Sequence, residues 1–492
     1  MTTKTLPSQP RKASTVSRWD RETDVVVIGM GAAGASAAIG ARTHGAEVLI
    51  LEAASGAGGT TAMAGGLIYM GGGTPTQQAC GFEDDTEEMY KYLMMASGPN
   101  ADEAKVRLYA DGSLEHYQWL IDHGMEFKPE YYASKSTNTP RDEGLIYSGN
   151  ETCYPFDEHS KAAPRGHKGK VHGEGGGKMV IDKLSEKAIA LGVEVEYDAR
   201  ALTAIINDDN EVVGIVSRID GQERCIKANK GVVLCAGGFI MNPEMVAKYA
   251  PRLSLGNIPN GNPNDTGIGI RIGMGVGGSA INMSEGFICL PFYPPASLVE
   301  GIMVNGKGQR FINEDCYHGR MGEAILSNPE DKHYLIIDSK NFAALDRPPM
   351  GGFKVAEVGE TIAELERDLG LTEDTLVNTL EVFNKHAKDG QDPLFHKRTP
   401  YLKPLDEPPY AAFDVSLNGG AYFPVFTLGG LNTLPTGEVL SEDDQIIKGL
   451  YAAGRNACGL PRCGATYSSG MSIGDATFFG KLAGKSAAQI EQ

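Results

Sequence analysis

The sequence lacks the features that mark several well-known protein classes. It has no run of about 18 apolar residues of the kind that spans a membrane. The first residues include Lys4, Arg11, Lys12 and Arg18 but no apolar core after them, which is not typical of a secretory signal. Basic residues number 45 against 63 acidic ones, and the formal net charge of −18 argues against nucleic acid or an anionic membrane as a partner.

Metal-binding patterns are also missing. The eight cysteines are scattered and form no C-x-x-C pair, so we predict neither zinc nor an iron–sulfur cluster. Reduced cysteines favour a cytoplasmic location. The histidines His159, His167 and His172 lie in an irregular segment, residues 124–178, but their spacing matches no metal motif. We therefore expect no metal and interpret this segment as a surface insertion.

Length and glycine content indicate a multidomain, ligand-binding protein. The chain has 492 residues, too many for a single core, so two or three domains are expected. Its 63 glycines gather in short patches, which favours a backbone that lies closely around a ligand. The polar residues up to about Trp19 are expected to form a disordered arm.

Residues 24–52 carry the strongest pattern. Val25 to Ile28 is a continuous apolar run typical of a buried parallel strand, and Val48 to Leu51 is a second one that ends at Glu52. Between them stand Gly29, Gly31 and Gly34 at G-x-G-x-x-G spacing, followed by small residues. This strand–turn–helix–strand order predicts a Rossmann-like dinucleotide site, with pyrophosphate at the helix N-terminus and ribose at Glu52. An ordinary tight strand–helix turn is the alternative.

A second glycine-rich segment indicates which dinucleotide is bound. It contains Gly58-Gly59-Thr60-Thr61 and Gly65-Gly66. NAD has no need for it, whereas the isoalloxazine of FAD must lie against bare backbone. From here the chain resembles the flavoprotein superfamily of fumarate reductases and succinate dehydrogenases. Covalent members attach the flavin to a histidine of this segment, but residues 53–73 contain none, so the resemblance implies non-covalent FAD.

Later segments complete the predicted cofactor site. Residues 231–239 form a buried strand that ends in small residues, and residues 264–267 resemble the next nucleotide-binding element of the family. The last helix, predicted over residues 472–489, would direct its N-terminal dipole at the flavin. The complete set of predicted cofactor residues is Gly29, Gly31, Ala32, Ala33, Gly34, Glu52, Gly58, Gly59, Thr60, Thr61, Gly65, Gly66, Ala236, Gly237, Asp265, Gly454, Ser472 and Ile473.

The predicted fold class is α/β, a Rossmann-like FAD-binding domain with an inserted α+β capping domain. Strand candidates at 302–304 and 334–337 alternate with helices at 361–369 and 372–389. We predict that residues 1–283 and 412–492 form the discontinuous FAD-binding domain. Residues 284–411 would form the capping, catalytic domain over the flavin.

Three substitutions relative to the fumarate reductase pattern argue against a dicarboxylate substrate. Where that pattern has its acid arginine, within R-F-x-N-E and the residues after it, this chain has His318. The family histidine before T-x-G-G is Phe426 here, and Tyr467 stands in or beside the place of the late substrate arginine. Without a cationic partner, the carboxylate of a buried substrate stays unpaired, which costs several kcal/mol.

The same positions resemble the 3-ketosteroid dehydrogenases. Residues 467–475, Tyr-Ser-Ser-Gly-Met-Ser-Ile-Gly-Asp, together with Tyr317 and residues 67–75, are nearest the Δ4-(5α) type, which introduces the C4–C5 double bond into 5α-reduced 3-ketosteroids. The Δ1 type usually has Tyr-Pro-Gly where this chain has Tyr-Ser-Ser. The resemblance implies a small apolar ketone, a steroid, held beside Phe426 and His318.

The resemblance also implies a mechanism. Tyr467 would remove the α proton while hydride leaves the β carbon, and Tyr317 and Ser469 would stabilise its phenolate and relay the proton; His318 is an alternative shuttle. A Δ1-dehydrogenase, an enoate reductase and a flavin carrier without a substrate remain alternatives. No motif identifies the electron acceptor or the oligomeric state.

Overall fold

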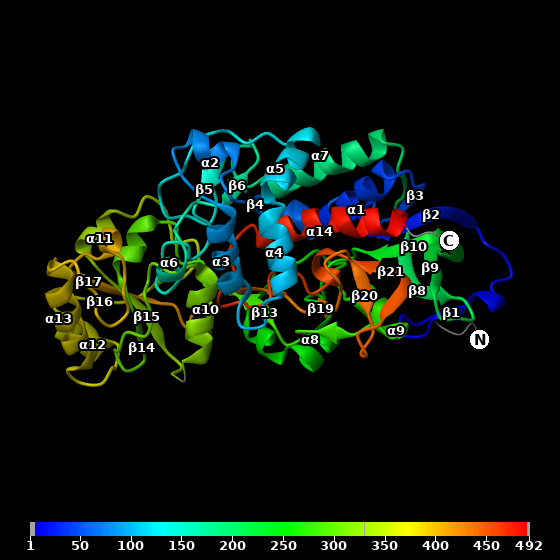
Figure 1. The fold of residues 1–492 in the computed structure, drawn as a ribbon. Helices are drawn as coiled ribbons and strands as arrows, with labels where there is room; N and C mark the ends of the chain where they lie inside the picture. Colours follow the sequence, from blue (N-terminus) through cyan, green and yellow to red (C-terminus); the bar gives the residue numbers. More distant parts are fainter. Residues whose placement is uncertain (1–4, 329, 490–492) are drawn as a thin grey trace.

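The structure, a computed structural model, describes residues 5–328 and 330–489. Its largest element is a nine-stranded sheet in the order β1-β8-β9-β10-β2-β3-β7, with β21 beside β10 and β20 beside β21 (Figure 1). The strands are β1 Arg11–Lys12, β2 Arg21–Ile28, β3 Val48–Leu51, β7 Glu194–Glu196, β8 Arg200–Ile206, β9 Val212–Ile219, β10 Gln222–Leu234, β20 Glu438–Leu440 and β21 Ile446–Ala452.

Strand β10 connects the antiparallel and the parallel parts of this sheet. It pairs antiparallel with β9 over residues 222–227, parallel with β2 over residues 226–234, and parallel with β21 over residues 232–234. Strand β2 also pairs parallel with β3, and Val25, Val26 and Val27 are fully buried. The buried apolar runs therefore form the parallel core, as predicted, and the class is α/β.

Small residues let two helices pack closely on this sheet. Helices α1 (Ala32–Thr43) and α14 (Met471–Ala488) lie side by side above it (Figure 1). A Cβ added at Gly484 would lie 1.8 Å from the carbonyl oxygen of Ala37, and one added at Gly40 would lie 2.2 Å from that of Lys481. Helix α7 (Gly176–Ala190) packs beside α1.

A second, antiparallel sheet lies at the other end of the molecule (Figure 1). Its order is β14-β15-β17-β16, and it contains the strands predicted at 302–304 and 334–337. The proposed domain boundaries stay a prediction; a boundary after β17 would keep that strand whole. The strands of this sheet are β14 Ile302–Asn305, β15 His333–Asp338, β16 Val355–Gly359 and β17 Tyr410–Asp414. The helices in the same part of the chain are α11 Ser339–Ala343, α12 Ile362–Asp368 and α13 Thr375–Lys388.

Short strands and helices connect the two sheets. The small sheets have the orders β4-β6-β5, β11-β18-β13 and β12-β19. The strands are β4 Leu67–Tyr69, β5 Leu145–Ile146, β6 Gly166–Lys168, β11 Ile258–Pro259, β12 Ala280–Ile281, β13 Gly286–Ile288, β18 Pro424–Thr427 and β19 Gly430–Leu431. The helices are α2 Pro75–Ala79, α3 Thr86–Ser97, α4 Glu103–Asp111, α5 Ser113–Asp122, α6 Phe156–His159, α8 Pro243–Tyr249, α9 Ile268–Gly275 and α10 His318–Ser327.

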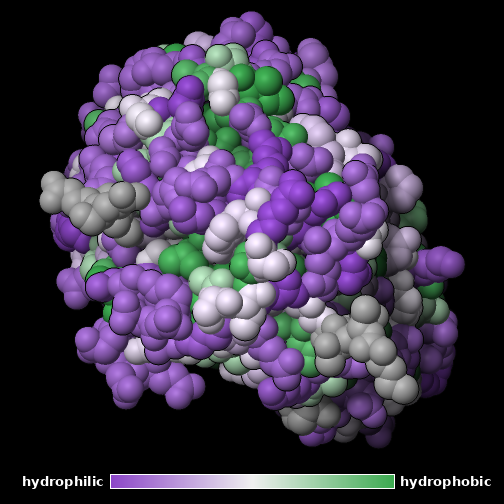
Figure 2. Space-filling model, turned by 90° about the vertical axis from the view of Figure 1, so that its right-hand side faces the viewer, coloured by the Kyte–Doolittle hydropathy of each residue, from purple (hydrophilic) through white to green (hydrophobic). Residues whose placement is uncertain are grey.

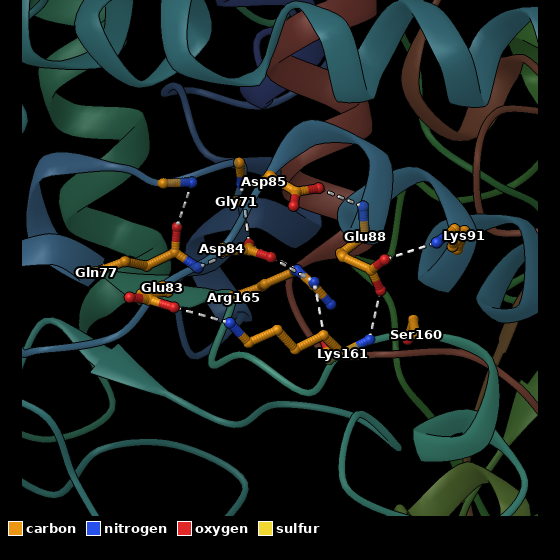
Figure 3. A network of polar contacts seen from close by, with 12 residues as sticks. Gly71, Gln77, Glu83, Asp84, Asp85, Glu88, Lys91, Ser160, Lys161 and Arg165 are labelled. Carbon is orange, nitrogen blue, oxygen red and sulfur yellow. Dashed lines mark hydrogen bonds and ion pairs between the residues drawn. The ribbon is translucent and has the colours of Figure 1, made fainter.

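Residues 124–178 are not a surface insertion, which corrects the sequence interpretation. Arg165 and Asp84 form an ion pair of 2.6 Å whose side chains are 0% and 1% exposed. Figure 3 shows Asp84 also accepting from the Gln77 amide, 3.0 Å away. His167 is buried and lies 2.8 Å from the Thr74 hydroxyl. Polar side chains in this segment are paired inside the protein, which composition alone does not reveal.

Residues 5–19 also differ from the expected disordered arm. Arg11 pairs with Ile205 at the edge of β8, and its guanidinium lies 2.6 Å from Glu223. Trp19 packs against the apolar cluster that includes Val216. The arm is ordered because it covers an otherwise open strand edge; residues 1–4 of the prediction lie outside the described residues.

The face seen from the right of Figure 1 is largely polar, with apolar residues in small groups (Figure 2). None of the helices in residues 5–328 and 330–489 has the length and apolar character needed to cross a membrane. In the same residues, no group of three or more His, Cys, Asp or Glu side chains is arranged to hold a metal ion.

Candidate active site

One continuous cavity runs from the glycine-rich turn to the two tyrosines. All but two of the sequence-predicted site residues line it; the exceptions are Gly34 and Gly58. The lining residues at the predicted cofactor end are Gly29, Gly31, Ala32, Ala33, Glu52, Gly59, Thr60, Thr61, Gly65, Gly66, Ala236, Gly237, Asp265, Gly454, Ser472 and Ile473. Those at the predicted substrate end are Tyr317, His318, Phe426, Tyr467 and Ser469.

The three glycines of the first turn have different surroundings. A Cβ at Gly34 would lie 1.9 Å from the Gly29 carbonyl oxygen, so Gly34 allows the helix to approach the strand. Gly29 has a φ of +96°, a conformation that glycine adopts without strain. Gly31 faces the cavity, where an added Cβ would meet nothing closer than the Thr61 hydroxyl at 3.5 Å. Gly31 thus leaves bare backbone towards a ligand.

Glu52 closes this end of the cavity. Its carboxylate is 7% exposed and accepts hydrogen bonds from the N–H groups of Met30 at 2.6 Å and Ala54 at 2.8 Å. Each oxygen keeps a second lone pair, so the carboxylate can still accept from a ribose hydroxyl. Its position at the end of β3 agrees with the predicted role.

Asp265 and Arg455 form an ion pair in the middle of the cavity wall. Oδ2 of Asp265 lies 2.7 Å from the Arg455 guanidinium and 2.6 Å from the Thr60 hydroxyl. The guanidinium carbon lies 5.7 Å from the centre of the Phe426 ring. The sequence reasoning missed Arg455, which directly follows the predicted Gly454. Because Asp265 compensates its charge, Arg455 is not a free anchor for a carboxylate.

Aromatic rings surround the other end of the cavity. The Phe287 ring centre lies 4.8 Å from that of Tyr467, 4.9 Å from that of Phe426 and 6.2 Å from that of Tyr317. Phe287 was not predicted; it stands opposite Phe426 where β13 pairs with β18. This arrangement offers a flat apolar ligand a lining of aromatic faces.

Tyr467 is held at the start of the last helix. Gly470 precedes α14 with a φ of +96°, and the Tyr467 hydroxyl lies 2.9 Å from Oγ of Ser472 in the first helical turn. Burial raises the pKa of Tyr467, while the contacts with Ser472 and the charge of Arg455 lower it. Its predicted partner, Ser469, instead reaches Tyr317, whose pKa burial raises well above the ordinary value and the Ser469 hydroxyl lowers.

His318 is neutral at physiological pH. Burial lowers its pKa to about 3. Nδ1 lies 3.1 Å from the carbonyl oxygen of Leu290, so Nδ1 carries the proton and donates it. The ring centre lies 3.9 Å from that of Tyr293. A neutral, packed imidazole is poorly suited to hold a carboxylate or to store a proton.

A protein-family profile described as "FAD binding domain" matches residues 24–465. The chain belongs to this flavoprotein family. The cavity fits FAD, because Gly31 and Gly59 present backbone without side chains and Glu52 lies at the end of β3. FAD would lie along the predicted cofactor residues, and the protein is an FAD-dependent oxidoreductase.

The chain is similar to several known steroid dehydrogenases and fumarate reductases. The structure of 3-ketosteroid-Δ4-(5α)-dehydrogenase from Rhodococcus jostii RHA1, in complex with 4-androstene-3,17-dione, is 42% identical, covers 98% of this chain and 100% of that chain, and has a TM-score of 0.93. A probable fumarate reductase of Shewanella frigidimarina is 28% identical over 95% of this chain and 75% of its own length. The 3-oxo-5-alpha-steroid 4-dehydrogenase of Comamonas testosteroni is 28% identical over 89% of this chain and 93% of its own length.

Proposed function

We propose that this flavoprotein is a 3-oxo-5α-steroid 4-dehydrogenase, which introduces the C4–C5 double bond into 5α-reduced 3-ketosteroids. The observation that carries the proposal is the 42% identity to a Δ4-(5α)-dehydrogenase over the whole of that chain. The aromatic end of the cavity supports it, since Phe287, Phe426 and Tyr467 suit a flat apolar body. At the aromatic end of the cavity, His318 is neutral and Arg455 is paired with Asp265, so neither offers a free cation to a dicarboxylate.

In the proposed reaction, Tyr467 removes a proton from C4, which is acidified by the C3 ketone. Bound FAD supplies the hydride acceptor for hydrogen leaving C5. When Tyr467 is ionised, the Ser472 hydroxyl would donate a hydrogen bond to its oxygen and so favour the phenolate, with Arg455 adding positive charge nearby. Tyr317 and Ser469 would relay the proton outward. A positioned base of this kind contributes about two to four orders of magnitude in rate.

Turnover of a panel of saturated 3-ketosteroids with an artificial electron acceptor tests this function. We expect oxidation of 5α-androstane-3,17-dione with the new double bond at C4–C5. A double bond at C1–C2 would indicate a Δ1-dehydrogenase instead, and reduction of an unsaturated acid would indicate an enoate reductase. The physiological electron acceptor is left open by this proposal, and a cytoplasmic location stays a prediction.

A further inference from the structure

A buried loop, residues 148–151, lies between the two segments that carry the active-site tyrosines. On one side, the Ser148 carbonyl accepts from the Ser469 N–H at 2.9 Å, and the Ser148 hydroxyl donates to the Ser469 carbonyl at 2.9 Å. On the other side, Oδ1 of Asn150 accepts from the Tyr317 N–H at 2.9 Å. The loop thus binds the backbone of both segments directly.

A third contact ties the loop to the residue after Tyr467. The Tyr92 hydroxyl accepts from the Asn150 N–H at 2.9 Å and lies 2.6 Å from Oγ of Ser468. A Cβ added at Gly149 would lie 2.0 Å from the same Oγ. The loop therefore has little freedom to move relative to the segment of Tyr467.

The conformation of the loop depends on Glu151. This side chain is 0% exposed, and its carboxylate accepts from the N–H groups of Gly149 at 2.8 Å and Ser148 at 3.3 Å. Within residues 5–328 and 330–489, no Lys, Arg or His nitrogen lies within 4.0 Å of its oxygens. Burial raises the pKa of Glu151, whereas hydrogen bonds from backbone N–H groups and the charge of Arg165 lower it. The loop N–H groups are thus direct partners of this buried carboxylate.

We propose that Glu151 is a positioning residue, which holds residues 148–151 in the shape that sets Tyr317 and Tyr467 against the substrate. Its hydrogen bonds go to backbone N–H groups of the loop, and through the loop it acts on the backbone of Tyr317 and Ser469. Its charge also raises the pKa of Tyr317. This inference rests on the proposed function for its effect on rate. Its effect on the backbone of the two segments is independent of that function.

The Glu151→Gln holoenzyme tests the inference. The glutamine side chain accepts through one oxygen and presents an NH2 group to the other loop N–H, so the loop loses one bond. By hydrogen-exchange mass spectrometry, we expect the peptides with Tyr317 and Ser469 to exchange about tenfold faster or more. At saturating 5α-androstane-3,17-dione, flavin reduction should be about 10- to 100-fold slower, with FAD content and steroid affinity nearly unchanged.

Glu143→Gln is the matched control. Glu143 is a buried carboxylate of the same segment that accepts from the Arg141 N–H at 3.1 Å and pairs with the Arg141 guanidinium at 2.8 Å. The Glu143→Gln variant should keep both the hydrogen exchange at Tyr317 and Ser469 and the rate of flavin reduction within about twofold of wild type. In a Tyr467→Phe background, Glu151→Gln should slow reduction by less than about threefold, because the positioned group is already absent.

Several results would overturn the inference. Unchanged hydrogen exchange at Tyr317 and Ser469 in Glu151→Gln would do so, whether or not the wild-type protein oxidises a steroid. A wild-type protein that oxidises no steroid would instead remove the proposed function. Faster exchange with normal reduction in Glu151→Gln would also overturn the inference, because the role would then be structural only. If Glu151→Gln does not fold, Asn150→Ala removes the acceptor of the Tyr317 N–H alone, and normal exchange or normal reduction in that variant overturns the inference.

Discussion

The Tyr467 hydroxyl lies 2.9 Å from Oγ of Ser472, and this contact joins the proposed base to the N-terminal turn of α14. Burial opposes ionisation of a phenol, whereas a hydroxyl donor and the positive end of a helix favour it. The charge of Arg455 acts in the same direction as Ser472. The rate of proton removal therefore depends on the neighbours of Tyr467 as well as on Tyr467 itself.

Ser472→Ala removes the hydrogen-bond donor of Tyr467. The pKa of Tyr467 should then rise, because the phenolate loses stabilisation while the phenol is little affected. At any given pH less phenolate is then present. The ascending limb of the plot of flavin-reduction rate against pH should therefore move to higher pH, by about half to one pH unit. Stopped-flow reduction by a 5α-3-ketosteroid between pH 6 and about 10 measures this. Ser469→Ala, which alters a contact of Tyr317 instead, is the control and should shift the limb less.

Gly31→Leu should abolish FAD binding without unfolding the protein. The side chain would enter the cavity, since the nearest atom to an added Cβ is 3.5 Å away, and it would occupy the space of the pyrophosphate. Flavin absorbance per protein, with circular dichroism as the folding check, measures the outcome. Gly56→Ala is the matched glycine control, because a Cβ there meets nothing within 4 Å. Normal flavin content in Gly31→Leu would contradict the assigned site.

Succinate and fumarate should neither bind tightly nor react. His318 is neutral, Phe426 is apolar, and Arg455 is paired with Asp265 at 2.7 Å. At the aromatic end a dicarboxylate would thus find no free cation in His318, Phe426 or Arg455, which costs several kcal/mol. Steady-state steroid turnover with millimolar succinate should show no competitive inhibition. Competitive inhibition at that concentration would mean that the aromatic end accepts carboxylates.

His167 should make the protein less stable in mild acid. Burial lowers its pKa to about 4, against about 6.5 in an unfolded chain. Between these values the unfolded chain binds a proton that the folded protein does not, so the free energy of unfolding falls as pH falls. The loss is at most about 1.4 kcal/mol per pH unit, and it ends near pH 4.

The variant His167→Gln isolates this contribution. Its Tm should be lower than wild type at pH 7 but should fall less between pH 6.5 and about 5. His159→Gln, at an exposed position, should follow the wild-type curve. Parallel curves for wild type and His167→Gln would show that the imidazole does not carry the predicted linkage.

The main architecture could be predicted because its signals are local in sequence. The apolar runs at 25–28 and 48–51 and the glycines between them specify buried parallel strands and a tight turn. Ile28, Gly29, Gly31 and Leu51 of these patterns line the cavity, so the cofactor end of the site could be predicted from them.

The substrate end was harder to predict because its contacts join distant segments. Whether Ser469 or Ser472 reaches Tyr467 depends on the turn at Gly470, which reverses the chain before α14. Phe287 enters the site only through pairing of β13 with β18. The burial of Arg165 depends on Asp84, 81 positions earlier, and a composition rich in charge and glycine favoured the wrong, surface interpretation.

Anaerobic flavin reduction tests the central claim most directly, because bound FAD is then the only oxidant. Mixed with 5α-androstane-3,17-dione, the wild-type protein should lose its flavin absorbance and form one 4-androstene-3,17-dione per FAD. Tyr467→Phe should keep its FAD and be slower by about two to four orders of magnitude. Failure of the wild-type flavin to bleach, or a product unsaturated at C1–C2, would contradict the proposed function. Near-normal bleaching in Tyr467→Phe would transfer the role of base to Tyr317 or His318.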